Sequence, residues 1–181
     1  MKKVFALCAA LFLTVLPLFA LPAFSREDET VSDLIDERKV HLWYEGQRFG
    51  DNMVIGARGV VTVIYVDGKF FRAVAREGNA LQWIRETTQY FGNEDTKGKK
   101  YFIVSLEVYK PWDFDYSLLT VGDYRVSEKD VISSISYNPE GTLESGSEWH
   151  FAFVVPESEV KPGKEVKIGY GDDSVIWKVP K

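Results

Sequence analysis

Several stretches of the chain alternate between apolar and other positions, which is the pattern of β-strands. In residues 101–109, one face carries Phe102, Val104, Leu106 and Val108. The same alternation groups Trp149, Phe151, Phe153 and Val155, then Val166, Ile168 and Tyr170, and finally Val175, Trp177 and Val179. A period of two predicts strands with one buried face and one solvated face, as in antiparallel sheets.

The first half of the chain is also rich in β-branched residues. We expect a short strand at residues 40–44, and residues 59–66 are apolar on both faces, which predicts a well-buried strand. Asp67 and Gly68 follow at once and precede another apolar-rich run at residues 69–75. An Asp-Gly pair between two such runs predicts a β-hairpin.

One segment has the spacing of a helix. Leu81, Ile84, Thr88 and Phe91 form a stripe within residues 79–91. Asn79 is suited to cap the first turn, and Gly92 stands where the cap of a helix C-terminus belongs. Short strands separated by Gly, Pro and Asp, with one helix inserted or packed among them, predict a mainly β fold with a sandwich or barrel architecture.

The first 25 residues have the pattern of a secretory signal peptide. Two lysines precede an uncharged apolar run at residues 4–24, and small residues occupy the positions required for cleavage after Ser25. Pro17 and Pro22 disfavour a helix that stays in a membrane. We therefore expect cleavage near Ser25 and a periplasmic or secreted protein with no stable membrane span; a retained anchor is the alternative.

Domain organisation follows from length and charge. Residues 26–39 are rich in charge, and we expect a loose N-terminal lead there, although Val31, Leu34 and Ile35 have the spacing of one short helical stripe. Residues 40–181 have the length of one ordinary domain, so a single sandwich domain is expected.

The single cysteine and the charge balance exclude some kinds of site and disfavour some kinds of partner. Cys8 is the only cysteine and lies in the signal segment, so the mature chain has no disulfide and no thiolate site. Lipid attachment at Cys8 is the alternative, but a lipidated cysteine normally follows the apolar run. Of the 22 basic residues two precede residue 26, and all 27 acidic residues follow it, which gives the mature chain a net charge of −7. This balance disfavours nucleic acid and anionic membranes as partners.

Catalytic motifs are missing from the sequence. No nucleophile, phosphate-binding or dinucleotide motif occurs, and two histidines, His41 and His150, leave few ways to build a triad or a metal site. Asp113 and Asp115 are interpreted as solvated turn carboxylates, because calcium needs several more oxygen ligands. The sequence therefore predicts a protein that is not an enzyme and uses no cofactor or metal.

The candidate binding residues are aromatic and lie in a loop around Pro111. They are Tyr109, Trp112, Phe114 and Tyr116. Exposed rings on a sandwich loop stack on sugars or anchor a protein partner, whereas buried rings fill the edge of the sandwich. An exposed Trp112 supports a carbohydrate- or small-ligand-binding module, and a buried Trp112 argues against it.

The last 80 or so residues carry an ordered set of strand signals. They are the run GKKYFIVSLEV at residues 98–108, DFDYSLL at 113–119, VGDY at 121–124, and ESGSEWHFAFVVP at 144–156. This order resembles the telokin-like, immunoglobulin-fold extracellular domain of unknown function found in secreted bacterial proteins and lipoproteins. The resemblance implies an immunoglobulin-like antiparallel β-sandwich over about residues 98–181, with residues 69–75 and the helix as an insertion. It brings no active site and implies an extracytoplasmic binding or structural role.

The expected function is therefore that of a secreted or periplasmic interaction module. It binds a protein, a peptide or a component of the cell envelope. A glycan or another small ligand, held by the aromatic loop at residues 109–116, is the alternative.

Overall fold

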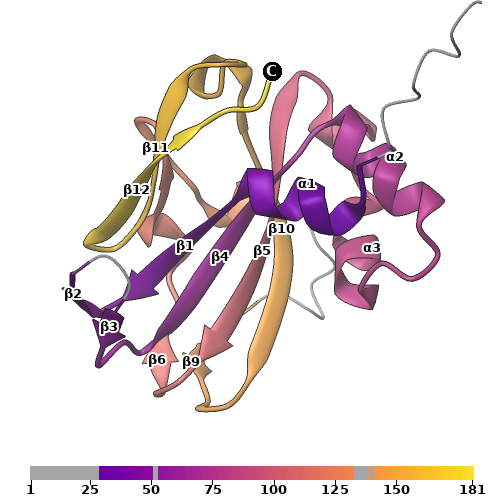
Figure 1. The fold of residues 1–181 in the computed structure, drawn as a ribbon. Helices are drawn as coiled ribbons and strands as arrows, with labels where there is room; N and C mark the ends of the chain where they lie inside the picture. The colour runs from indigo at the N-terminus through magenta and orange to yellow at the C-terminus, as the bar shows by residue number, and fades with distance from the viewer. Residues whose placement is uncertain (1–28, 51–52, 133–138, 140) are drawn as a thin grey trace, which may run out of the picture.

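The computed structural model describes residues 29–50, 53–132, 139 and 141–181. These residues form two four-stranded antiparallel sheets that pack face to face, and helices cover the far side of one of them (Figure 1). Sheet A has the strand order β1-β4-β5-β10, and sheet B has the order β12-β11-β7-β8. The predicted mainly β sandwich with a packed helix is confirmed. The expected signal peptide and Cys8 lie outside the described residues.

The elements have the following bounds. Sheet A consists of β1 (Lys39–Tyr44), β4 (Gly59–Val66), β5 (Lys99–Val108) and β10 (Glu148–Pro156). Sheet B consists of β7 (Leu119–Val121), β8 (Tyr124–Arg125), β11 (Glu165–Tyr170) and β12 (Asp173–Lys178). Two short pairs join β2 (Gln47–Phe49) to β3 (Met53–Ile55) and β6 (Trp112–Asp113) to β9 (Thr142–Leu143). The α-helices are α1 (Val31–Arg38), α2 (Gly68–Arg76) and α3 (Gln82–Thr88). Single 3-10 turns cover Glu94–Thr96, Tyr116–Leu118, Glu128–Asp130 and Glu157–Glu159.

The main core lies between the two sheets and follows the predicted alternation. The predicted inward residues of β5 and β10 are buried there, except that Trp149 is half-buried, and they are joined by inward residues of β1, β4, β7 and β11. Phe102 and Phe153 stack in its centre, with ring centroids 5.2 Å apart and planes at 10°. Each such side chain contributes about 1.5–3 kcal/mol by leaving water.

A second core lies on the outer side of sheet A. The solvated outer face predicted for β5 and β10 is wrong at this end, whereas the burial predicted for both faces of β4 is confirmed. Tyr101 and Ile103 of β5, Ile64 of β4 and Val154 of β10 point away from sheet B and are buried beneath the helices. The Tyr101 hydroxyl donates a 2.6 Å hydrogen bond to the carbonyl oxygen of Thr87 in α3. Sheet A is therefore the middle layer of three at this end.

The predicted Asp67-Gly68 hairpin is wrong, because these residues begin helix α2. The Asp67 carboxylate accepts a 2.8 Å hydrogen bond from the backbone N–H of Phe70, which makes Asp67 the N-cap. Phe70, Ala73 and Val74 are the buried residues of the helix, and their spacing is helical rather than alternating.

The expected loose lead is also wrong from Val31 onward, because this segment forms helix α1. Thr30 and Asp33 make a capping box at its start, and Val31 is buried against sheet A and α2. Arg38 ends the helix with only 2% of its side chain exposed, paired with Glu37 and, at 3.1 Å, with the N-cap carboxylate of α2.

The helix predicted at residues 79–91 is present but shorter. It spans Gln82–Thr88, and Leu81 rather than Asn79 occupies the N-cap position, without a side-chain hydrogen bond. Gly92 was expected to cap the C-terminus, but the helix ends earlier and Gln89 is its C-cap. Gly92 has a φ of +85°, which suits the turn that follows. The described residues thus hold two more α-helices than the one predicted.

Candidate functional site

Trp112 of the predicted aromatic loop is buried and is not available to a ligand. Only 4% of its side chain is exposed, and Tyr44 packs against it edge to face at 5.1 Å. Its ring fills the space above Gly59, where an added Cβ would lie 2.1 Å from the indole. Tyr109 is 45% exposed but follows β5 on its outer face. The four residues therefore do not form one flat binding platform.

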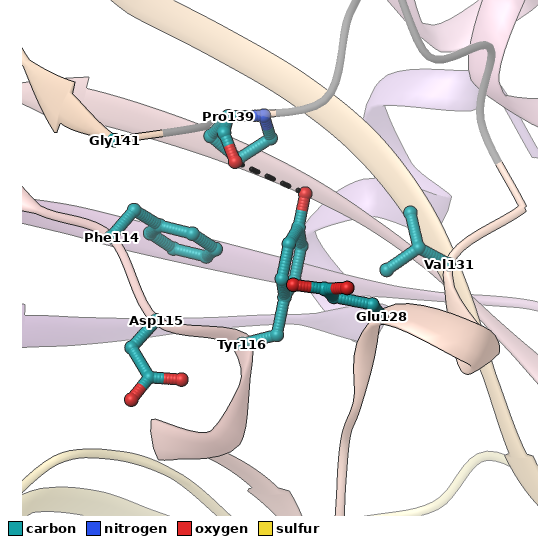
Figure 2. Close-up of a pocket in the computed structure, with 7 residues that line it drawn as sticks. All are labelled: Phe114, Asp115, Tyr116, Glu128, Val131, Pro139 and Gly141. Carbon is teal, nitrogen blue, oxygen red and sulfur yellow. Dashed lines mark hydrogen bonds between the residues drawn. The ribbon is translucent and has the colours of Figure 1, made fainter.

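Phe114 and Tyr116 line a pocket of about 510 Å³ at one end of the sandwich (Figure 2). Phe114 stacks on Tyr170 at 5.5 Å, and Tyr116 meets Phe151 edge to face at 5.4 Å. The Tyr116 hydroxyl donates to the carbonyl oxygen of Pro139 at 3.2 Å. Both rings therefore pack against side chains of the main core and cover its edge. Little of either ring face is left for a ligand.

The polar groups of this pocket are carboxylates. Figure 2 shows Glu128 beside the Tyr116 ring, whereas the Asp115 carboxylate points away from both rings. Asp115 caps the following turn, because its Oδ1 accepts from the Ser117 N–H at 2.7 Å. The pocket offers apolar edges and negative charge, but no described cationic side chain lines it.

A larger candidate surface lies on sheet A, beyond the helices. The helices gather over the end of the sheet where β1 and β5 begin, and the other end is not covered by any described helix (Figure 1). We call the outward-facing residues at this end the open face. It comprises His41, Trp43, Val60, Thr62, Ser105, Glu107, Tyr109, Glu148 and His150. Two of these are not open themselves: Val60 is buried, and Trp83 of α3 reaches over the His150 ring.

The strand register arranges the open face in two rows. The first row runs His41, Thr62, Ser105, His150 across β1, β4, β5 and β10. The second row runs Trp43, Val60, Glu107, Glu148 across the same strands. His41, Glu107 and Glu148 are exposed, and Thr62, Ser105 and His150 are half-buried. Both predicted histidines thus lie in one row, at opposite edges of the sheet.

Local contacts hold several of these side chains in place. His41 Nδ1 and Thr62 Oγ1 are hydrogen-bonded at 2.9 Å. Trp83 of α3 stacks on His150, with ring centroids 4.5 Å apart and planes at 11°. Burial lowers the pKa of His150 below its ordinary value, and the nearby carboxylates of Glu148 and Glu86 only partly oppose this.

The two histidines of the open face are not brought together. His41 and His150 are three interstrand spacings apart, or roughly 14 Å, which is too far to bind one metal ion. Among the described residues, no group of three or more His, Cys, Asp or Glu side chains is placed to hold a metal. No hydrogen bond between Ser105 and His150 is present in the part of the chain that the structure describes, although they are cross-strand partners.

A sequence signal for the open face exists, but it is not periodicity. Along β5 the outward residues change from Tyr101 and Ile103 to Ser105 and Glu107, and along β10 they change from Val154 and Ala152 to His150 and Glu148. This change from apolar to polar residues within one face marks where the helices stop. The alternation alone assigns the whole face to solvent.

Comparisons with known proteins do not assign the chain to a family. No helix in the described ranges combines the length and apolar character needed to cross a membrane. No protein-family model, no curated protein and no solved structure matches the chain. The resemblance to the telokin-like domain therefore stays a prediction, and the site is interpreted from its own geometry.

Proposed function

We propose that this protein is a secreted or periplasmic, non-enzymatic interaction module of immunoglobulin-like type. It binds a protein, a peptide or a component of the cell envelope through the open face. Localisation is supported by the N-terminal signal pattern. The observation that carries the binding role is that one half of a sheet face lacks the helical layer that covers the other half. It also presents the aromatic side chains of Trp43 and Tyr109, a residue class that is enriched at interfaces.

The hairpin β2–β3 supports a macromolecular partner. It extends the β1–β4 connection and carries three large apolar side chains, Phe49, Met53 and Ile55, that are 52%, 57% and 52% exposed. The register places all three on one face, while Arg48 on the opposite face is bonded to Asp173 of β12 at 2.9 Å. Exposed apolar patches with polar rims are typical of protein interaction sites.

Site-specific photocrosslinking in cells that make the protein tests this proposal. A photoreactive residue replaces Ser105 on the open face or Met53 on the hairpin, and a control replaces the exposed Lys167 on sheet B. We expect one discrete adduct from the first two positions and none from Lys167. Equal labelling from all three positions, or no adduct from Ser105 and Met53, contradicts the proposal.

A small-ligand role remains the second candidate because of the pocket in Figure 2. Its volume of about 510 Å³ lies within the range of small-molecule sites, roughly 300–1,000 Å³. A thermal-shift screen against monosaccharides and cell-wall fragments tests it, because a ligand that binds only the native state raises the melting temperature. A shift that is lost in Glu128→Gln supports this candidate, and the absence of any shift removes it.

A further inference from the structure

We propose that the outward face of sheet B lies against an anionic lipid surface. The strand register groups the residues of this sheet that point away from sheet A, and we call them the B face. It comprises Thr120, Arg125, Glu165, Lys167, Gly169, Ser174, Ile176 and Lys178. This surface is separate from the open face, so the inference goes beyond the function proposed above and adds a second contact.

The B face is uncovered and level. The helices pack on the outer side of sheet A, which is the opposite side of the molecule (Figure 1). One row across the centre of the B face runs Ser174, Gly169, Thr120, and a Cβ added at Gly169 would lie 2.9 Å from Thr120 Oγ1. Because this row has only small side chains, a flat partner can approach the sheet closely.

The charge of this surface is positive and is not neutralised within the protein. The basic side chains on the B face, or beside the end of the sheet where β11 begins, are all exposed and are Arg125, Lys161, Lys164, Lys167, Lys178 and Lys181. Glu165 is the acidic residue on the face, and Asp123 and Asp172 lie in the turns at its margins. Within the described part of the chain, none of these basic side chains forms an ion pair. In sheet A, by contrast, Lys39 and Lys100 are both paired with carboxylates.

The charges of the expected mature chain are segregated. Residues 161–181 hold five lysines and three acidic residues, a side-chain charge of +2, whereas residues 26–160 carry −9. The overall negative charge disfavours anionic membranes only over the distance that it reaches, which is about 8 Å at physiological ionic strength. Packed sheets are themselves about 10 Å apart. Carboxylates on the outer side of sheet A are therefore screened from a surface that touches the B face, and the local positive charge decides the interaction.

An exposed isoleucine favours a lipid surface over a soluble polyanion. Ile176 is 61% exposed and is the direct cross-strand partner of Lys167, and Lys178 follows two residues later on the same face. A polymer of phosphates offers no apolar contact to this side chain, whereas a bilayer has acyl chains just below its charged head groups. Basic side chains around an apolar one are typical of proteins that bind the surface of anionic membranes.

Vesicle sedimentation tests the inference. The exported protein, purified as cells process it, is mixed at about 150 mM salt with vesicles of phosphatidylcholine alone, or of phosphatidylcholine and phosphatidylglycerol in equal parts. The face variant is Lys167→Gln with Lys178→Gln. The control variant is Lys99→Gln with Lys129→Gln, which removes the same charge from two exposed lysines that line one pocket at the edge of sheet A.

We expect binding to the anionic vesicles and none to the neutral ones. The face variant loses at least about tenfold in affinity, because each basic residue near an anionic surface contributes a factor of about five. The control loses less than about twofold, since its lysines lie away from the B face. Equal losses in both variants, or no binding of the wild type to anionic vesicles, overturn the inference.

A third variant, Ile176→Ser, distinguishes a lipid surface from a soluble polyanion. We expect it to lose about threefold in affinity for anionic vesicles, because an apolar contact with the bilayer is removed. Its affinity for fluorescein-labelled polyphosphate, followed by fluorescence anisotropy, should equal that of the wild type. Binding of polyphosphate together with an unchanged vesicle affinity of Ile176→Ser would assign the B face to a soluble polyanion and reject the lipid surface.

Failure of this inference is distinguishable from failure of the proposed function. A lipid that is crosslinked to residue 167 adds too little mass to give the discrete adduct that a protein partner gives. Vesicle binding without an adduct at Ser105 or Met53 supports the membrane contact and rejects the partner of the open face. An adduct at those positions without vesicle binding does the reverse.

Discussion

The outer face of sheet A has two halves that differ in what covers them, although the same strands build both. In the covered half, Ile64, Ile103 and Ala152 form one row beneath the helices; in the open half, the next row is Thr62, Ser105 and His150. One step of the pleat separates a fully buried row from a half-buried one, and at His150 the ring of Trp83 in α3 still reaches over the second row. Whether a strand position is buried is therefore decided by the docked helices as well as by alternation.

The largest difference in the free energy of unfolding is expected between a polar substitution in the covered row and an apolar substitution in the open row. Ile103→Ser creates a cavity and buries a hydroxyl, so it should lower the free energy of unfolding by about 3–5 kcal/mol. Ser105→Ile adds an apolar group at a half-buried site and should change it by less than about 1 kcal/mol. Urea denaturation measures both. Similar losses in the two variants would show that the halves are equally packed.

The attachment of the helices gives the next contrast. Asp67→Ala removes the N-cap of α2 and leaves the buried Arg38 without that partner, which should cost about 2–4 kcal/mol of the free energy of unfolding. Asp36→Ala breaks only the exposed pair with Lys39 and should cost less than about 0.5 kcal/mol. The same denaturation experiment separates them, and a small effect of Asp67→Ala would mean that α1 and α2 dock independently of this pair.

Two tyrosines on one strand face sharpen the comparison further. Tyr101→Phe deletes the buried bond to the Thr87 carbonyl and should lower the free energy of unfolding by about 1–2 kcal/mol. Tyr109→Phe removes a hydroxyl from an exposed ring and should change it by less than about 0.5 kcal/mol. Thermal melts of both variants beside the wild type measure this difference. An equal loss of stability in Tyr109→Phe would show that a hydroxyl in the open half contributes as much as one in the covered half.

The smallest expected effect is on the pH dependence of stability. Burial lowers the pKa of His150 in the folded state, so the unfolded state binds more protons once the pH falls below about 6.5. Stability contributed by the neutral ring is therefore present above that pH and is lost as the pH falls. His150→Gln should flatten the loss of stability between pH 7.5 and 5.5. An unchanged slope would place the titration elsewhere, His41 being the other histidine with a lowered pKa.

Sequence patterns predicted strands better than they predicted the helical layer. Alternation identified β5, β10 and β11 because the core between the sheets enforces it. The hairpin predicted at Asp67-Gly68 was wrong because an aspartate before a glycine is suited both to a hairpin turn and to a helix N-cap. Burial of Trp112 agrees with the general tendency of large aromatic residues, but the sequence does not show where it packs, since that depends on the gap above Gly59 on a strand far away in sequence. The pairing of Glu107 with Glu148 likewise exists only through the register.

The two ends of the described chain are joined in a way that bears on when the protein can fold. The Trp43 N–H donates to Asp173 Oδ2 at 2.7 Å across a sequence separation of 130, and Trp177 Nε1 donates to the Glu37 carbonyl at 3.3 Å across 140. Contacts of such long range form late and make folding slow. Strand β1 of sheet A cannot make its contacts with β12 of sheet B before nearly the whole chain has been synthesised. For the export that we propose above, such a delay is an advantage, because a chain has to be unfolded while it is threaded through a membrane.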